Sequence, residues 1–560
     1  MSQWIKNSVF YHIYPIGFCG CPEYNDGITE YRLDKLTDWI PHLKELGVNA
    51  LYLGPVFQSK KHGYDTSDYY HIDCRLGDNE SFKKICDKLH ENGIRIVLDG
   101  VFNHVGRDFW AFQDVQKNGQ ASQYSSWFQN LNFDGRSPYG DNFWYEGWSG
   151  HYDLVKLNLK NPAVVGHLIK AVELWMDEFH IDGLRLDAAD CIDPEFFKEL
   201  RRFCKEKDPE FWLMGEIIHG DYNRWANPYM MDSVTNYECY KGIYSSHNDK
   251  NYFEIAHSMQ RQFANGGIYQ NLCLYNFVDN HDVNRIASTL KNIQHIKNVH
   301  TLLFTMPGVP SIYYGSEWAI EGKRTNNSDD MLRPTLDLSS APHDYTGLAT
   351  HISKLSAVKK HFKALCEGKF ENVLIRNEQL VFKRFTNDQT VLTALNVNDS
   401  EVWVDFNIEG GCVLTDVLID GSEYRVENNH VHIMIPANGS RVLVLHNGYF
   451  NYKDFCEQIN KEANVKVEIP SAEANSDCKD TEQEVEKETD IKLGRYRHFK
   501  GNEYAVIAFA TDSETLEKTV IYKQLYNNGD YWVRPAKMFC DVVEVDGRKV
   551  PRFEYIDSEN

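Results

Sequence analysis

Short apolar runs alternate with amphipathic segments over the first two thirds of the chain. The amphipathic segments repeat apolar residues at helical spacing, at 33–47, 81–93, 162–179 and 194–208. The apolar runs predict buried strands at 9–16, 49–56, 94–101, 182–188, 211–217, 229–234, 274–280 and 310–315. Strands that alternate with helices predict a parallel sheet, and this number of strands predicts a closed (β/α)8 barrel.

Other stretches predict further domains beside the barrel. Residues 105–160 are rich in Trp, Tyr, Asn, Asp and Gly, and they separate the third and fourth strands by more than a plain loop would. After about 367 the runs alternate apolar and polar residues, as half-buried antiparallel strands do. We therefore expect the barrel at 1–104 and 161–366, an inserted domain at 105–160, and a C-terminal antiparallel β-sandwich at 367–447.

The chain changes character again beyond the sandwich. Residues 448–493 contain a predicted helix at 450–465 and the acidic stretch 471–490, which has no aromatic residue and predicts a solvated linker. Residues 494–557 contain short strand-like runs and predict a small β-rich domain, which we interpret as a small β-barrel. We interpret the aromatic residues of this domain as its core, with a ligand-binding face as the alternative.

Charge and cysteine usage narrow the class of protein. The chain of 560 residues has a net charge of −22, which argues against binding to nucleic acid or to an anionic membrane. No apolar run approaches the roughly 20 residues of a membrane span, and the first residues lack the pattern of a secretory leader. The 13 cysteines lack metal-ligand spacing, so we expect reduced thiols. We expect a cytoplasmic protein without nucleic-acid or membrane partners, and a homo-oligomer stays open.

Charged residues stand at the ends of several predicted strands. The stretch HIDGLRLDAADCI at 180–192 places Arg185 and Asp187 in an apolar run, where buried charges are costly unless they are paired or functional. The other strand ends and the segment after the second strand supply His62, Tyr64, Asp65, Asp99, Asn103, His104, Glu216, Asp279, Asn280, His281 and Asp282. The C-terminal strand ends of a barrel share one rim, where active sites form. A structural ion pair explains Arg185 and Asp187, but it does not explain carboxylates at four strand ends.

These residue types fit the cleavage of a glycosidic bond. A retaining glycosidase uses one carboxylate as nucleophile and one carboxylic acid as proton donor, about 5 Å apart. Arg185 and Asp187 are two residues apart, so their side chains leave the same face of the strand, and we expect Arg185 to lower the pKa of Asp187. Glu216 follows an apolar run, which suits an acid kept protonated by burial. We therefore predict Asp187 as the nucleophile and Glu216 as the acid.

Six segments, in order along the chain, carry a resemblance to a known family. They read GVNALYLGP (47–55), DGVFNH (99–104), GLRLDAAD (183–190), MGEI (214–217), FVDNHD (277–282) and GVPSIYYGSEW (308–318). They are similar to sequence regions of glycoside hydrolase family 13, the α-amylase family. The resemblance covers about 1–447 and implies a barrel with an inserted domain B and a C-terminal β-sandwich, which the apolar pattern also predicts.

The resemblance also implies roles for individual residues. Asp187 is the nucleophile, Glu216 is the acid/base, and Asp282 is the third carboxylate, which binds sugar hydroxyls and distorts the ring. The remaining expected site residues are Arg185, His104 and His281, which contact the sugar, Tyr64, which stacks on it, and Asp99, which supports Arg185 and the rim. In the inserted domain Trp144, Tyr145 and Trp148 are candidates for sugar subsites, with core packing as the alternative.

The segment LVKLN at 154–158 is similar to MPKLN of neopullulanases, cyclomaltodextrinases and maltogenic amylases. The likeness favours maltodextrins and starch oligosaccharides as substrates, with cyclodextrin or pullulan as further candidates. Val155, the AADC after the nucleophile and Ile217 depart from that subgroup. No cofactor is implied except calcium (Ca2+), which stays open: Asn103 matches a calcium ligand of the family, while many intracellular members lack that site.

The leading hypothesis is a retaining hydrolase of α-1,4-glucosidic bonds that forms a covalent glycosyl-enzyme on Asp187. One alternative is a transglycosylase of the same family, which passes the same intermediate to a sugar. Another is a catalytically inactive sugar-binding protein. Residues 494–557 resemble a bacterial domain family of unknown function, number 1653 in its series, which indicates a bacterial source and leaves a protein-interaction role as a hypothesis.

Overall fold

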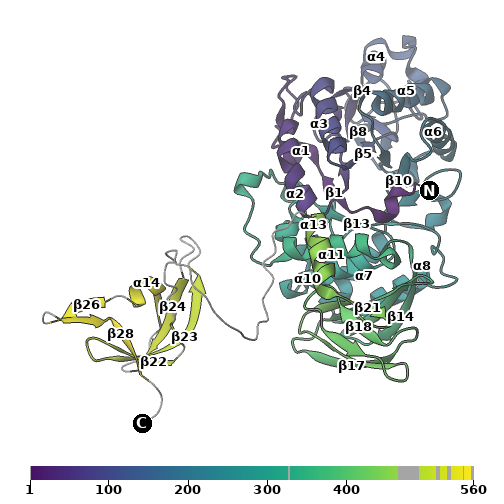
Figure 1. Ribbon diagram of the computed structural model, residues 1–560. Helices are drawn as coiled ribbons and strands as arrows, with labels where there is room; N and C mark the ends of the chain where they lie inside the picture. The colour runs from purple at the N-terminus through teal and green to yellow at the C-terminus, as the bar shows by residue number, and fades with distance from the viewer. Residues whose placement is uncertain are drawn as a thin grey trace. The chain divides into compact units, whose positions relative to one another are not determined.

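The chain forms two compact units, Met1–Glu468 and Ile469–Asn560 (Figure 1). The computed structural model describes residues 2–325, 328–463, 491–492, 494–511, 518–525, 531–540, 542–545 and 548–556. Within these residues no helix is both long and apolar enough to cross a membrane.

A parallel sheet of eight strands forms the centre of the first unit. In sheet order its strands are β11 (Ser233–Val234), β10 (Trp212–Gly215), β9 (Gly183–Leu186), β5 (Arg95–Gly100), β2 (Ala50–Leu53), β1 (Phe10–Ile13), β13 (Val309–Tyr313) and β12 (Tyr275–Asn276). A parallel bridge between Thr235 and Tyr275 joins the two end strands and brings the sheet close to a closed barrel. Each strand lies within a run that the apolar pattern predicts, except that β13 begins one residue before its run at 310–315, so the prediction of a (β/α)8 barrel is confirmed.

Helices follow most strands of the barrel. They are α3 (Asn79–Glu91), α5 (Pro162–Glu178), α6 (Pro194–Lys207), α7 (Tyr237–Asn248), α8 (Phe253–Phe263), α10 (Ile296–Thr305) and α11 (Leu348–His361). The prediction of a single helix at 33–47 is wrong, because a 3-10 helix at Arg32–Trp39 is followed by α2 (Ile40–Glu45). Pro41 lies in the first turn of α2 and has no N–H to continue a preceding helix, so the chain starts a new one there.

The barrel strands contact two apolar layers, one inside the barrel and one between the strands and the surrounding helices. Leu98 belongs to the large cluster that the strands share with the surrounding helices, whereas its neighbour Val97 packs inside the barrel with Phe10 and Trp212. The ring centroids of Phe10 and Trp212 are 5.3 Å apart. This apolar plug fills the barrel, so polar side chains on the same inner face gather beyond it, at the C-terminal ends of the strands.

Two segments inserted between barrel elements lie at the C-terminal ends of the strands. After β2 the chain forms an antiparallel pair, β3 (Phe57–Ser59) and β4 (Thr66–Ile72), and the segment between them carries Tyr64. After β5 the inserted domain contains α4 (Trp110–Asn118) and an antiparallel sheet with the order β6-β8-β7. Its strands are β6 (His104–Gly106), β8 (His151–Lys156) and β7 (Gly147–Trp148).

The C-terminal part of the first unit contains antiparallel sheets, as the alternating pattern predicts. The larger sheet has the order β14 (Lys369–Ile375), β15 (Gln379–Phe385), β16 (Thr390–Asn396), β21 (Ser440–His446), β18 (Val413–Asp416) and β19 (Glu423–Arg425). The smaller sheet pairs β17 (Val402–Asn407) with β20 (His430–Ile435). Val404, Ile433 and Leu443 lie in the core that the two sheets share. The helix α13 (Tyr452–Ala463) follows within the range predicted for it, and the predicted linker at 471–490 lies outside the described residues.

The second unit contains one five-stranded antiparallel sheet and one hairpin. The sheet order is β25 (Tyr531–Pro535), β24 (Lys518–Gln524), β23 (Glu503–Thr511), β22 (Gly494–His498) and β28 (Phe553–Ile556), and the hairpin pairs β26 (Val542–Val545) with β27 (Arg548–Pro551). The interpretation as a small β-barrel is wrong for the described residues, because β25 and β28 form the two ends of an open sheet. The short helix α14 (Ala536–Phe539) buries Phe539 against Phe553, with the two rings stacked at 4.1 Å, so a helix covers this sheet.

Candidate active site

The register of the barrel brings Asp99, Arg185 and Glu216 together. Asp99 on β5 pairs directly with Arg185 on β9, and Arg185 pairs with Met214 on β10. Side chains two residues apart share a face of a strand, and Met214 points into the barrel, so Glu216 continues the inner face just beyond β10. The strand pattern thus accounts for three charged side chains at one point of the rim.

Arg185 binds three carboxylates at once. Its Nη1 lies 3.0 Å from Asp99 Oδ1 and 2.9 Å from Asp187 Oδ1, and its Nη2 lies 2.8 Å from Glu216 Oε2. The Arg185 side chain is 4% exposed, so these contacts are shielded from water. Asp187 and Glu216 therefore face the same space from adjacent nitrogens of one guanidinium.

The protonation of Asp187 differs from the sequence-based expectation. Burial raises the pKa of Asp187 well above its ordinary value, and the neighbouring Glu216 and Asp99 raise it further. Arg185 lowers this pKa, as we expected, but it is shared with the other two carboxylates and does not outweigh burial. In the free protein the cluster therefore keeps a proton at pH values where an exposed aspartate would have lost its own.

Asp187→Asn should change how stability depends on pH. An unfolded aspartate releases its proton near pH 3.9, whereas folded Asp187 holds it to higher pH, so stability falls as pH rises between the two pKa values. Asparagine removes that loss, and we expect the variant to be more stable than the wild type by about 0.5–2 kcal/mol at neutral pH. Urea unfolding between about pH 4 and pH 8 measures this difference. Asp190→Asn, an exposed position, is the control; equal slopes for Asp187→Asn and the wild type would contradict the prediction.

Two histidines stand on either side of this cluster. His104 Nε2 lies 3.9 Å from Asp187 Oδ2 and has no hydrogen-bond partner, although it is buried. Burial and the nearby His62 lower the pKa of His104 to about 3, so its imidazole is neutral. A neutral ring with a free nitrogen beside Asp187 is suited to a hydrogen bond with a sugar hydroxyl.

His281 joins Asp282 to Tyr64. Its Nε2 is 3.0 Å from Asp282 Oδ2 and 2.5 Å from the Tyr64 hydroxyl, which also donates to Asp99 at 3.2 Å. The rings of Tyr64 and His281 are nearly parallel, at 10° with centroids 5.5 Å apart. Burial alone would raise the pKa of Asp282, but His281 and Arg333 outweigh it and hold that pKa below its ordinary value. Asp282 is therefore ionised throughout the neutral range.

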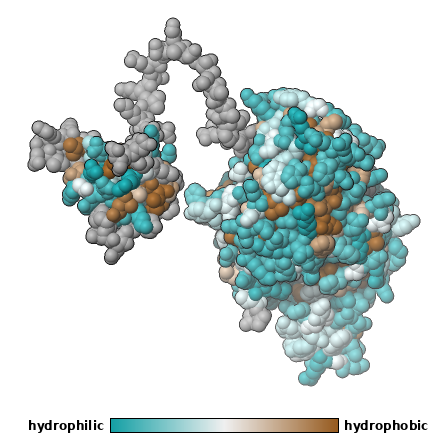
Figure 2. All heavy atoms as spheres, turned by 90° about the horizontal axis from the view of Figure 1, so that it is seen from below, coloured by the Kyte–Doolittle hydropathy of each residue, from teal (hydrophilic) through white to brown (hydrophobic). Residues whose placement is uncertain are grey.

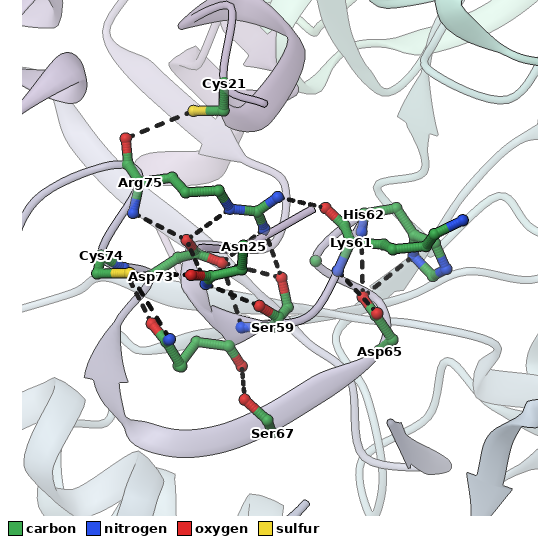
Figure 3. A network of polar contacts seen from close by, with 12 residues as sticks. Cys21, Asn25, Ser59, Lys61, His62, Asp65, Ser67, Asp73, Cys74 and Arg75 are labelled. Carbon is green, nitrogen blue, oxygen red and sulfur yellow. Dashed lines mark hydrogen bonds and ion pairs between the residues drawn. The ribbon is translucent and has the colours of Figure 1, made fainter. Parts of the chain in front are cut away.

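A buried ion pair fixes the segment that carries Tyr64 (Figure 3). Arg75 and Asp73 are both fully buried and 2.8 Å apart, and Arg75 donates to the carbonyl of Lys61 at 2.8 Å. The backbone N–H of Lys61 in turn donates to Asp65 at 2.8 Å, and so does that of His62 at 3.1 Å. Asp65 therefore shapes the turn before Tyr64 from within, which is a structural role.

Arg75→Lys should loosen this segment. Lysine keeps the positive charge but cannot reach Asp73 and the Lys61 carbonyl with one planar group, so buried acceptors lose partners. We expect a loss of about 1–3 kcal/mol in the free energy of unfolding, together with a higher KM. Chemical unfolding and initial-rate kinetics measure the two effects. Arg136→Lys, at an exposed position, is the control; an unchanged KM would show that the network does not hold Tyr64 in place.

Some residues singled out in the sequence lie away from the cluster. Asp279 is buried and accepts hydrogen bonds from the Ile286 N–H and the Ser316 hydroxyl, so it has a structural environment. Asp190 is exposed. In the inserted domain Tyr145 is fully buried, as a core residue is, whereas the Trp148 ring lies 5.5 Å from His104 and borders the cluster.

Two functional candidates escaped the sequence analysis. Arg333 donates to Asp282 at 3.2 Å and to the carbonyl of His281 at 3.0 Å, and it directly follows a short 3-10 helix at Asp330–Leu332. The Tyr237 hydroxyl lies 3.4 Å from Glu216 Oε1 and 3.2 Å from Asn280 Nδ2. Tyr237 begins α7, and its place directly after a predicted strand is the signal that points to it.

A cavity of about 830 Å³ opens next to the residues that surround Tyr64 and His281. Its wall includes Tyr14, His62 and Arg333, and the guanidinium of Arg333 lies 4.6 Å above the Tyr14 ring. A volume in this range accepts a small-molecule ligand, for which the usual range is about 300–1,000 Å³. This space adjoins Arg333, which contacts Asp282, whereas Asp187 and Glu216 are not among the residues of its wall.

The residues around Asn103 do not fit a calcium ion. Calcium takes six to eight oxygen ligands, most of them carboxylates and carbonyls. The Asn103 side-chain oxygen is buried and unpartnered. The side-chain nitrogen of Asn103, however, lies 3.1 Å from His104 Nδ1, and its backbone carbonyl accepts a hydrogen bond from the Leu157 N–H. Among the described residues no three His, Cys, Asp or Glu side chains form a possible metal site. The side chains around Asn103 therefore give calcium no role in the chemistry of the cluster.

Comparison with known families matches both units of the chain. Residues 12–344 match the model of the alpha amylase catalytic domain, and residues 494–555 match a family described as a protein of unknown function, DUF1653.

Characterised relatives match along most of the first unit. A cyclomaltodextrinase from Bacillus sp. is 31% identical over 419 residues, which is 70% of this chain and 73% of that protein. An intracellular maltogenic amylase from Bacillus subtilis is 30% identical over 417 residues, 70% of this chain and 69% of that protein. Neopullulanase 2 from Thermoactinomyces vulgaris is 30% identical over 447 residues, 72% of this chain and 74% of that protein.

Solved structures show the same fold. A cyclomaltodextrinase superposes with a TM-score of 0.68 at 27% identity, covering 79% of each chain. The debranching enzyme of Nostoc punctiforme, soaked with acarbose, superposes with a TM-score of 0.64 at 26% identity and covers 79% of this chain and 99% of its own.

Proposed function

The chain belongs to the α-amylase family of glycoside hydrolases, and from that premise we propose that it is a retaining hydrolase of α-1,4-glucosidic bonds. The observation that carries this proposal is the pair of carboxylates, Asp187 and Glu216, bound to one buried guanidinium. Two carboxyl groups that face the same space are what double displacement at a sugar carbon requires.

In the first step an oxygen of Asp187 attacks the anomeric carbon, and the bond from that carbon to the glycosidic oxygen breaks. Glu216 gives its proton to the departing oxygen, so the leaving group departs as an alcohol. In the second step Glu216 takes a proton from water, the water oxygen attacks the anomeric carbon, and Asp187 is released as a carboxylate. The first step begins with one proton on the pair, which burial of the cluster retains in the free protein. The second step begins without that proton, and Glu216 regains it from water as Asp187 is released.

The surrounding residues supply binding and charge. We propose that Arg185 steadies the negative charge as it moves between Asp187 and Glu216, because it contacts both and is itself buried. His104 and His281 would hold sugar hydroxyls, Asp282 would bind hydroxyls as a permanent anion, and Tyr64 would stack on the ring. Asp99 keeps Arg185 in position by accepting two contacts from Nη1.

We propose maltodextrins and starch oligosaccharides as the substrates, with cyclodextrin and pullulan as further ones. The names of the relatives support this class, and the cavity beside Tyr14 and Arg333 offers room for sugars that extend the chain. A cytoplasmic location and a bacterial source are part of the same proposal, supported by the relative named an intracellular enzyme. Transfer to a sugar acceptor remains the alternative, because the same intermediate serves both reactions.

A product time course on maltoheptaose, β-cyclodextrin, pullulan and starch tests the proposal. We expect cleavage with retention of the α configuration, which NMR of the first products reports. Products longer than the substrate at high maltoheptaose concentration would favour the transglycosylase. A wild-type protein that leaves all four substrates intact yet binds maltoheptaose would overturn the hydrolase assignment and favour a sugar-binding protein.

A further inference from the structure

A second cavity lies at the opposite end of the barrel from the carboxylate cluster. Residues 271–273 and 307–308, which line it, come directly before β12 and β13, and Lys6 comes before β1, so the cavity is at the N-terminal ends of the strands. Residues 367–371 and Arg384, from the start of the C-terminal sandwich, complete its wall. Its volume of about 480 Å³ is within the usual range of small-molecule sites.

Two buried cations stand at this cavity. Arg384 lines it and is 2% exposed, and Lys359, fully buried, donates to the carbonyl of the lining residue Gly308 at 3.3 Å. Among the described residues neither cation has a carboxylate within ion-pair distance, as is also true of the buried Arg285. The buried Arg75, Arg185 and Arg441 each have at least one. A buried charge without a counter-charge is costly, so the positive charge here needs an explanation.

Carbonyl groups at the ends of two helices offset part of this positive charge. Arg384 donates to the carbonyls of Thr305, at the end of α10, and Gly368, just after α12 (Lys363–Glu367), both at 3.0 Å. Lys359 also donates to Leu365 in α12 at 3.2 Å. Burial lowers the pKa of Lys359, so Arg384 is the more persistent cation of the two, and the helix carbonyls offset part of its charge.

The nearby thiols do not supply the missing anion. Burial raises the pKa of Cys273, so its thiol is neutral. Cys366 donates its S–H to the carbonyl of Lys359 at 3.0 Å and therefore acts as a donor there. Part of the positive charge of Arg384 is therefore left for a ligand to neutralise.

We propose that this cavity binds a phosphorylated monosaccharide, with the phosphate on Arg384. Contacts to the two carbonyls use three of the five guanidinium N–H groups, which leaves donors for an anion, and a planar guanidinium matches phosphate geometry. The side-chain amides on the wall suit the hydroxyls of a sugar, and they belong to Gln260, Asn265, Gln270 and Asn271.

The mouth of the cavity does not repel such an anion. Lys6 and Lys369 stand there, and the two acidic residues of the wall are each paired with lysine. Glu367 is 3.4 Å from Lys6 and 3.2 Å from Lys363, and Glu371 is 3.1 Å from Lys383. A free inorganic phosphate would satisfy Arg384 but would leave most of the 480 Å³ empty, which favours the sugar ester.

Isothermal titration calorimetry of the full chain with glucose 6-phosphate, inorganic phosphate and glucose tests the proposal. We expect one site for glucose 6-phosphate, weaker binding of inorganic phosphate, and no Arg384-dependent signal from glucose, whose binding at the carboxylate cluster would not involve Arg384. Arg384→Gln should weaken glucose 6-phosphate at least about tenfold, the usual effect of losing a charged hydrogen bond.

Two substitutions of exposed lysines, one at the cavity and one away from it, keep the test decisive if Arg384→Gln does not fold. Lys369→Glu reverses a charge at the mouth and should weaken glucose 6-phosphate several-fold, whereas Lys117→Glu makes the same change on exposed α4 and should not. Absence of glucose 6-phosphate binding, or binding that neither Arg384→Gln nor Lys369→Glu weakens, would overturn the proposal. Equal affinity for inorganic phosphate would overturn its sugar part.

Discussion

Asp187→Asn should reduce the rate of maltoheptaose cleavage at least about a thousandfold, which is about 4 kcal/mol of transition-state stabilisation. The amide keeps the shape of the carboxylate and one acceptor oxygen for Arg185, but it cannot form the covalent bond to the anomeric carbon. Because binding contacts remain, KM should change much less than kcat. Initial rates with coupled detection of reducing ends measure both quantities.

The control for this experiment is Asp190→Asn, the same chemical change three residues further along the chain at an exposed position. It should leave kcat within a factor of about two, as surface substitutions do. A kcat for Asp187→Asn within tenfold of the wild type would rule out Asp187 as the nucleophile. Glu216→Gln would then become the next variant to measure, because Glu216 is the other carboxylate on Arg185.

Arg185→Met should abolish activity and also destabilise the first unit by about 3–5 kcal/mol, the usual cost of breaking a buried ion pair from one side. Methionine fills much of the volume but leaves Asp99, Asp187 and Glu216 in one buried space without a cation. Chemical unfolding at neutral pH measures the loss. Arg202→Met, which breaks pairs with Glu199 and Glu206 on the exposed side of α6, should cost less than about 1 kcal/mol.

The reason for this loss can be tested separately from its size. If like charge causes it, Asp99→Asn should restore part of the stability in the Arg185→Met background, although it removes hydrogen bonds in the wild-type background. The single variant Arg185→Met should also recover stability at low pH, because protonation then removes the carboxylate charges. Additive losses in the double variant would show that packing, and not charge, is what Arg185 provides.

The barrel is predictable from sequence because its strands are buried on both faces. Such strands read as continuous apolar runs, and even the two-residue ladders of β11 and β12 lie within predicted runs. Pro41 marks the division of 33–47 into two helices in the sequence, but the 3-10 form of the first is harder to predict, since amphipathic spacing is similar for a 3-10 and an α-helical turn over a few residues. The open sheet of the second unit could not be predicted, because it depends on which strands pair with each other. The alternation of apolar and polar residues within a strand does not specify its partners.

The candidate site is predictable as far as it lies on strands. Asp99, Arg185 and Glu216 follow inward-facing residues at even spacing, so their convergence follows from the period of a strand. Arg333 belongs to a segment without periodicity, and its contact with Asp282 exists only in the folded chain. The prediction for the pKa of Asp187 is wrong because the sequence shows Arg185 two residues away, but neither the burial that raises this pKa nor the two other carboxylates that share Arg185.

The pairing of Asp99 with Arg185 also bears on how the barrel folds. A slip of one residue between β5 and β9 turns alternate side chains to the opposite face, which would move Arg185 into the apolar layer beneath the helices. An arginine there would have no carboxylate to meet, so a misaligned barrel is penalised by several kcal/mol relative to the native one. The charges assigned to chemistry thus also select the correct alignment of strands during folding, and variants that neutralise all of them should misfold more often.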